Sequence, residues 1–190
     1  IAVIGAGKQA GGPEVTLEFN LIEGGFKGPV MPVNPDHQSI AGVLAYKDID
    51  DLPVTPDLAI LTTPLEKAPE LIDRLGARGT RAALLLSREI LQDHLGIRPG
   101  LLSAGLQKNH PDGGELLKQR VLDAAKPHLL RIIGPDHLGY AVPSNQVNAS
   151  LNDNRPLPGH IALLCQSAAV MRSVIDWARS RNIGFSHAIS

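Results

Sequence analysis

Aromatic residues, cysteine and long apolar runs are all scarce in this 190-residue chain, and each shortage excludes a class of protein. Aromatic side chains make up only 3% of the sequence, so a surface that stacks nucleic-acid bases is not expected. The single cysteine, Cys165, excludes an internal disulfide framework and a cysteine-based zinc cluster. No apolar run approaches the roughly 20 residues that span a bilayer, and no signal peptide is seen. These shortages together predict a cytoplasmic protein.

An excess of charge of either sign is also missing. The formal net charge is −1, which gives no reason to expect a nucleic-acid or membrane partner. The seven histidines are scattered, and no pair of them has the helical spacing of metal ligands. We therefore expect no metal site.

What the sequence does contain is an alternation of short apolar runs with longer amphipathic stretches. Such runs are typical of parallel strands buried on both faces, and strand–helix alternation predicts a doubly wound, Rossmann-like α/β sheet. Residues 88–113 interrupt the alternation, and we expect a mobile loop there. The predicted strands are 1–5, 29–33, 57–63, 81–87 and 129–134, with 42–46 as a weaker candidate, and the predicted helices are 13–24, 67–77 and 114–126.

A second α/β domain is predicted after the turn-rich linker at 152–159. A strand at 160–166, a helix at 167–182 and a further strand from 183 follow this linker. We place the boundary near residue 156, giving domains at 1–155 and 156–190. The chain starts without methionine inside an apolar run, so we expect it to be a piece of a longer protein.

The helix at 167–182 has recognisable start and packing features. Ser167 occupies the position of an N-cap. Val170, Val174 and Trp177/Ala178 recur at helical spacing, which predicts that this stripe packs on the sheet and that Trp177 fills the core.

The opening stretch "VIGAGKQAGGPE" (3–14) contains a glycine-rich turn directly after the first strand. Gly5, Gly7 and Ala10 satisfy the G-x-G-x-x-G/A fingerprint of dinucleotide sites. However, Pro13 is the natural first helical residue, so the glycines form a longer loop ahead of the helix. Asn34 also follows the second strand where NAD sites place an acid. Binding of a phosphate-bearing ligand, binding of NAD through Asp36, and simple close packing of strand and helix all remain open from the loop alone.

Several segments in order resemble one family. They are "IAVIGAG", "LIEGGFKGPVMPVNP", "DLAILTTP", "RIIGPDHLGY", "NAS" and "CQSAAVMRSVIDWARSRNIGFSHAIS". They resemble the CoA-binding domain, and the start of the flavodoxin-like domain after it, of NDP-forming acyl-CoA synthetases. This superfamily includes ADP-forming acetate–CoA ligases and the succinyl-CoA synthetase α subunit. Ala168 and Ala169 stand where ligases usually have Gly-Ala, and this is closest to a branch fused to a GNAT protein lysine acetyltransferase.

The resemblance implies a site for CoA or acetyl-CoA at the carboxyl ends of the strands. Its phosphate loop would include Gly5, Gly7, Lys8, Gln9 and Gly11. The adenine and ribose of CoA would lie against Val33, Asn34 and Pro35, and its pantetheine arm would pass Thr63, Pro64 and Ser87. The thiol end would lie near Asp136 and His137. A second turn, formed by Gln166, Ser167 and Ala168, corresponds to one that receives the phosphate of a phosphohistidine in ligases, with an ordinary helix N-cap as the alternative.

Two departures from the ligase pattern guide the expected function. Ligases typically have Gly-Pro-Asn-Cys-Leu-Gly where this chain has "GPDHLG", so Asp136 adds negative charge and His137 adds bulk near the thiol. The resemblance therefore implies first a sensing or regulatory region of a GNAT-type acetyltransferase, with protein lysines as substrates of another domain. The alternative is the CoA-binding part of an active ADP-forming ligase, and a further alternative is an NAD(H)-sensing Rossmann module.

The same resemblance limits what this chain can do alone. ATP or ADP would bind only through parts outside it, and the protein would be an oligomer. No catalytic residue is assigned except His137 as a weak candidate, and we expect the chain alone to be non-catalytic.

Overall fold

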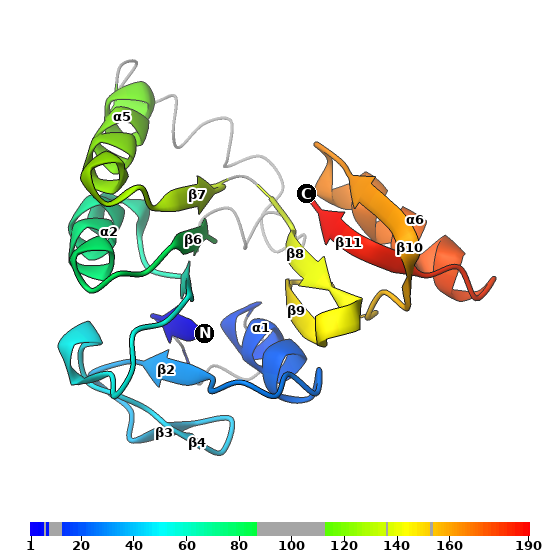
Figure 1. The fold of residues 1–190 in the computed structure, drawn as a ribbon, viewed down its shortest axis with the longest axis horizontal. Coiled ribbons are helices and arrows are strands. Elements are labelled where there is room, and N and C mark those ends of the chain that lie inside the picture. Colours follow the sequence, from blue (N-terminus) through cyan, green and yellow to red (C-terminus); the bar gives the residue numbers. More distant parts are fainter. Residues whose placement is uncertain (6, 8–12, 87–112, 136, 153) are drawn as a thin grey trace. The chain divides into compact units, whose positions relative to one another are not determined.

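A computed structural model describes residues 1–190 except 6, 8–12, 87–112, 136 and 153 (Figure 1). The chain forms two compact units. Unit 1 comprises Ile1–Gly5 and Met31–Asp136, and unit 2 comprises Ala6–Val30 and His137–Ser190. The predicted mobile loop lies almost entirely outside the described residues.

Unit 1 is built on a five-stranded parallel sheet with the order β2-β1-β5-β6-β7. This arrangement confirms the predicted Rossmann-like α/β fold. Strands β1, β2, β5 and β6 are apolar and largely buried, which matches the continuous apolar runs of the sequence, whereas the edge strand β7 is only partly buried. The strands are β1 (Ala2–Ile4), β2 (Met31–Val33), β5 (Leu58–Leu61), β6 (Ala82–Leu85) and β7 (Arg131–Ile133).

Helices α2 (Ala68–Ala77) and α5 (Gly113–Ala125) lie side by side in unit 1 (Figure 1). They contribute Ile72, Leu75 and Val121 to a core that also contains the buried side chains of the strands. A small antiparallel hairpin, β3 (Ser39–Ile40) with β4 (Val43–Leu44), follows β2 and includes the weaker predicted strand. Short 3-10 helices complete unit 1: η1 (Ile49–Asp51), η2 (Leu65–Lys67) and η3 (Lys126–His128).

Unit 2 contains a mixed four-stranded sheet with the order β10-β11-β8-β9. β10 and β11 are parallel, whereas β11–β8 and β8–β9 are antiparallel. The predicted strand–helix–strand of the second domain is confirmed, but β8 and β9 were not predicted. The elements are α1 (Pro13–Ile22), β8 (Gly139–Val142), η4 (Pro143–Asn145), β9 (Val147–Ser150), β10 (Pro158–Leu164), α6 (Ala168–Arg179) and β11 (Phe185–Ile189).

Strand β9 carries a buried polar cluster that joins it to α1. The amide Nδ2 of Asn20 on α1 donates to the carbonyl oxygens of Ser150 and Asn152, each at 2.9 Å. The Ser150 hydroxyl donates to Asn148 Oδ1 at 2.6 Å. All four side chains are buried. Buried polar groups require such partners. These bonds satisfy the cluster in part, because the side-chain amide nitrogens of Asn148 and Asn152 have no hydrogen-bond partner among the described residues.

The prediction that the stripe of Val170, Val174 and Trp177/Ala178 on α6 packs on the sheet is wrong. The buried residues are Ala168, Met171, Ile175 and Ala178, whereas the Trp177 side chain is 54% exposed. Of the predicted stripe, only Ala178 lies in the interior. The helix carries two apolar stripes, and tertiary packing rather than spacing decided which one is buried. Trp177 does not fill the core. The Arg181 guanidinium lies over its indole ring, with Arg181 Cζ 4.6 Å from the ring centroid.

A capping box and an ion-pair network anchor η1 in unit 1. The Asp48 carboxylate accepts from the Asp50 N–H at 2.9 Å, and the Asp51 carboxylate accepts from the Asp48 N–H at 3.2 Å. Arg74 of α2 pairs with both Asp48 and Asp50. The Asp50 N–H, followed by Arg74, lowers the pKa of Asp48. The folded state therefore favours the ionised carboxylate.

We predict that Asp48→Ala lowers the free energy of unfolding by about 1 kcal/mol at pH 7, the ordinary cost of losing a cap. Because the pKa of Asp48 is lowered by folding, this stabilisation is present above about pH 4 and is lost as the pH falls through the folded pKa. Urea denaturation at neutral and acidic pH measures it, with Glu66→Ala on η2 as an exposed-carboxylate control. A difference between wild type and Asp48→Ala that is unchanged in acid would contradict the account.

Candidate functional site

The carboxyl ends of β1, β2 and β5 meet at one edge of the sheet in unit 1. Ile4 is in register with both Val33 and Leu61, so the residues that follow these strands become neighbours. The Gly5 N–H donates to the Val33 carbonyl at 3.0 Å, and the Thr62 N–H donates to the Ile4 carbonyl at 2.9 Å. Open α/β sheets bind ligands at this edge, so this is the candidate site.

Gly5 is the most tightly constrained residue of this edge. Its φ is +89°, and a Cβ there would lie 2.7 Å from Thr63 Cγ2 and 3.0 Å from Thr62 Oγ1. Any side chain would therefore be strained by the backbone conformation and would also collide with the end of β5. The close approach brings the start of the glycine-rich loop against Thr62 and Thr63.

The two threonines after β5 have different environments. The Thr62 side chain is 1% exposed, and its hydroxyl donates to the Ile4 carbonyl at 3.1 Å. The Thr63 hydroxyl oxygen is also buried, but it has no hydrogen-bond partner in the described part of the chain. Leaving a buried polar group unsatisfied costs about 1–3 kcal/mol. The Thr63 hydroxyl therefore has the properties of a group that a ligand would satisfy.

The segment after β2 is fixed by backbone and side-chain bonds. The Asn34 N–H donates to the Tyr46 carbonyl at 2.8 Å, and Asn34 Oδ1 accepts from the Asp36 N–H at 2.8 Å. The Val33 side chain is buried in the core, so Val33 contributes to this edge only through its backbone carbonyl, which accepts the Gly5 N–H. The Asn34 side chain thus shapes the turn into Pro35 by accepting the Asp36 N–H.

The remaining described candidates lie in unit 2. His137 is buried, with 3% of its surface exposed, and Gly139 two residues later lies close to the Ala149 carbonyl. Ser167 is confirmed as the N-cap of α6, because its hydroxyl accepts from the Val170 N–H at 3.4 Å. In the turn before α6, Gln166 is exposed and Ala168 is buried. Gly7 is half-buried.

Five predicted site residues lie outside the described residues: Lys8, Gln9, Gly11, Ser87 and Asp136. Two residues that sequence reasoning missed contribute to the edge in unit 1, namely Thr62 through its hydroxyl and Tyr46 through its carbonyl. The "TT" pair directly after an apolar run could have indicated Thr62. No cluster of three metal-ligating side chains, and no helix with the length and apolar character to cross a membrane, occurs among the described residues.

Comparison with known families identifies the class. Residues 1–143 match the model of the CoA binding domain, so the chain belongs to this family. Residues 158–190 match the succinyl-CoA ligase like flavodoxin domain. Both matches confirm the superfamily that the sequence motifs resembled.

The chain is also similar to individual acetate–CoA ligases and to a solved acetyl-CoA synthetase. It is similar to the ADP-forming acetate–CoA ligase I of Archaeoglobus fulgidus, with 29% identity over 190 residues that cover all of this chain and 25% of the relative. It is 26% identical to the α subunit of the ADP-forming acetate–CoA ligase I of Pyrococcus furiosus and covers 38% of it. The solved dinucleotide-forming acetyl-coenzyme A synthetase 1 of Ca. Korarchaeum cryptofilum matches with a TM-score of 0.80 and 27% identity, over all of this chain and 38% of that one.

These relatives are named as ligases and a synthetase, so they favour the ligase alternative over the acetyltransferase-associated hypothesis. The chain spans between 25% and 38% of their length.

We predict that Gly5→Ala destabilises unit 1 by about 2–5 kcal/mol, because left-handed strain of about 1–2 kcal/mol adds to a steric collision of about 1–3 kcal/mol. Gly42→Ala is the matched control, since Gly42 also has a positive φ of +80° but a Cβ there would meet nothing within 4 Å. Urea denaturation of both variants measures the difference. Equal costs would show that close approach at Gly5 is unimportant.

Proposed function

We propose that this chain is the CoA-binding region of an ADP-forming acyl-CoA ligase of the acetate–CoA ligase type. The observation that carries the proposal is the carboxyl edge of unit 1, where Gly5 allows no side chain and the buried Thr63 hydroxyl lacks a partner in the described part of the chain. A glycine cradle beside an unsatisfied hydroxyl fits a polar, phosphate-bearing ligand at this edge. Membership of the CoA binding domain family supports CoA as that ligand.

The residues present suggest how CoA would be held. The glycine-rich loop from Gly5 would approach its phosphates, the turn at Asn34 and Pro35 its adenine and ribose, and Thr63 and Pro64 its pantetheine arm. When bound, CoA supplies a thiol that carries the acyl group as a thioester. The chain's own part is to bind this ligand and fix its direction along the strand ends.

In unit 2, His137 remains a candidate for the thiol end, and Gln166, Ser167 and Ala168 for a phosphate turn. Ser167 already serves as the N-cap, and its neighbouring amides at the start of α6 would favour an anion. ADP would bind through parts outside this chain. The Korarchaeum acetyl-coenzyme A synthetase 1, solved in complex with phosphate and ADP, supports ADP as a ligand of the complete protein. The α-subunit name of the Pyrococcus relative supports an oligomer.

The acetyltransferase-associated function stays a second candidate because of one feature, the alanine pair Ala168–Ala169 in place of Gly-Ala. Both candidates require CoA or acetyl-CoA at the same edge. Assays of the full-length protein separate them: formation of ATP from ADP, phosphate and acetyl-CoA supports the ligase, whereas lysine acetylation without this reaction supports the second candidate.

We predict that CoA binds with an affinity measurable by calorimetry and that Thr63→Val weakens binding about two- to twelvefold. This range corresponds to one net hydrogen bond of about 0.5–1.5 kcal/mol. Thr80→Val is the matched control, because the Thr80 hydroxyl is also buried without a partner among the described residues but precedes β6 at the opposite end of the strands. Its CoA affinity should equal that of the wild type.

Three outcomes would contradict the proposal. Folded protein that binds no CoA would refute it, and binding of NADH instead of CoA would favour the Rossmann sensor. A Thr63→Val variant with unchanged affinity would remove this hydroxyl from the site.

A further inference from the structure

Unit 2 contains a cavity of about 230 Å³, and no candidate residue of the CoA site lines it. Gly24 borders it just after α1, Gln146 and Val147 border it at the start of β9, and Pro158 borders it at the start of β10. Pockets for drug-sized ligands measure roughly 300–1,000 Å³, so this cavity has room only for a small molecule.

The walls of this cavity are rigid and mainly apolar. Pro143, Pro156 and Pro158 contribute rings that fix φ and so limit movement of the backbone, and Val147 adds an aliphatic surface. The end of α1 approaches β9 closely, since a Cβ at Gly24 would lie 3.2 Å from the Gln146 carbonyl oxygen. A preformed apolar cavity suits the hydrocarbon part of a ligand.

Among the described residues, Arg155 is the one charged side chain that lines this cavity. It is half-buried and held from two sides: its Nη1 donates to the Glu23 carbonyl, and its own carbonyl accepts from Arg179 Nη1 at 2.8 Å. It forms no ion pair with a carboxylate in the described part of the chain. A guanidinium has five N–H donors and no acceptor, so Arg155 retains donors for an anion.

Asn148 provides a second donor at the cavity. Its side chain is buried, and its Oδ1 accepts from the Ser150 hydroxyl at 2.6 Å, which leaves Nδ2 as the free end of the amide. Nδ2 is also buried and has no hydrogen-bond partner within the described ranges. Such groups are rare in native proteins because leaving them unsatisfied is costly. Asn148 and Arg155 therefore both favour a ligand that supplies acceptor oxygens.

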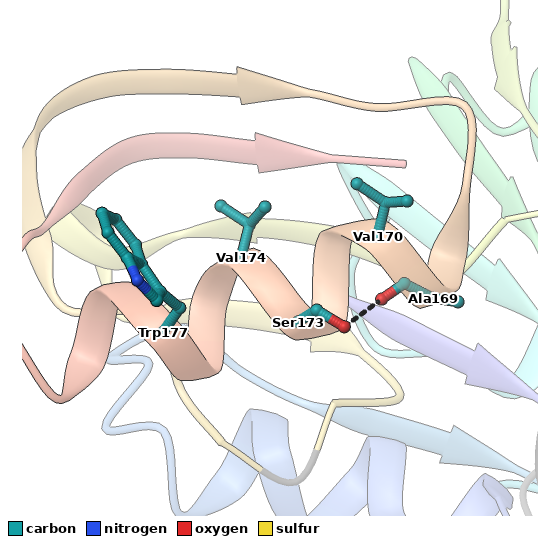
Figure 2. Close-up of a pocket in the computed structure, with 5 residues that line it drawn as sticks. All are labelled: Ala169, Val170, Ser173, Val174 and Trp177. Atoms are coloured by element: carbon teal, nitrogen blue, oxygen red, sulfur yellow. Dashed lines mark hydrogen bonds between the residues drawn. The ribbon is translucent and has the colours of Figure 1, made fainter.

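Another cavity, of about 460 Å³ on α6, has a different lining. Val170, Val174 and Trp177 project from the same side of the helix (Figure 2), and the Ser173 hydroxyl donates to the Ala169 carbonyl at 3.0 Å. None of the described residues that line it carries a charge. The cavity beside Arg155 is therefore the better candidate for an ionic ligand.

We propose that the cavity beside Arg155 binds a small aliphatic carboxylate. The carboxylate accepts N–H bonds from the Arg155 guanidinium and the Asn148 amide, and its hydrocarbon chain lies against Val147 and the proline rings. A planar guanidinium matches the two oxygens of a carboxylate, whereas a doubly charged phosphate would meet a single cation and apolar walls. This site is independent of the proposed CoA site, because the two share no residue.

Calorimetric titration of the full-length protein with butyrate tests the proposal. Wild type should bind butyrate, and Arg155→Gln should weaken binding about tenfold or more, because a charge-assisted hydrogen bond is lost. Arg131→Gln on β7 is the matched control, since Arg131 is also an arginine but is exposed and lies outside the cavity, so its affinity should equal that of wild type. Absence of butyrate binding, or equal affinities of wild type and Arg155→Gln, would overturn the proposal.

Ligand selectivity in the wild-type protein provides an independent test. Butyramide, which has the shape of butyrate but no charge, should bind at least tenfold more weakly than butyrate. Sulfate should also bind more weakly, because it has no hydrocarbon chain for the apolar walls. Butyramide that binds as tightly as butyrate, or sulfate that does so, would overturn the assignment of an aliphatic carboxylate.

The role of Asn148 is tested by Asn148→Asp. This change keeps an oxygen for the Ser150 hydroxyl but replaces the amide donor with a group that repels a carboxylate, so butyrate binding should be lost. The Tm verifies that the variant is folded. Retained binding in the folded variant would overturn the proposal, and if the variant does not fold, Arg155→Gln and the ligand series still decide it.

Discussion

The register of three parallel strands is the constraint on which the candidate site depends. Ile4 of β1 is in register with Val33 of β2 and Leu61 of β5, and the hydrogen bonds of Gly5 and Thr62 continue this pairing beyond the strand ends. A glycine is then required at position 5, because a side chain would collide with Thr63. The result is a close-packed edge at which the buried Thr63 hydroxyl has no hydrogen-bond partner among the described residues. The chain belongs to the CoA binding domain family, and our proposal assigns CoA to this edge.

Sequence periodicity predicted the elements that depend on local or strongly apolar patterns. The parallel strands of unit 1 are continuous apolar runs, and Ser167 is a capping residue next to a helical pattern, so both predictions were correct. Strands β8 and β9 were missed because they are short and contain small or polar residues such as Asn148 and Ser150. Asn20 makes long-range hydrogen bonds to the carbonyls of Ser150 in β9 and of Asn152 after it, and a single sequence does not reveal such bonds.

The candidate site was predictable only where it depends on local sequence patterns and not where it depends on long-range contacts. Sequence and family resemblance pointed to strand-end residues, and Gly5 and Thr63 do lie together at one edge. The contrast between the satisfied hydroxyl of Thr62 and the unsatisfied hydroxyl of Thr63 required three-dimensional contacts. Likewise, spacing alone could not decide which stripe of α6 is buried. The stripe containing Trp177 was a correct prediction of apolar character but a wrong prediction of its location.

The most direct test of the central claim is NMR mapping of amide resonances during a CoA titration. If the carboxyl edge of unit 1 binds CoA, the amides of Gly5, Asn34 and Thr63 should shift together, while those of Asp57 and Thr80 before β5 and β6 should not. Shifts confined to the opposite ends of the strands, or no shifts at saturating CoA, would contradict the account.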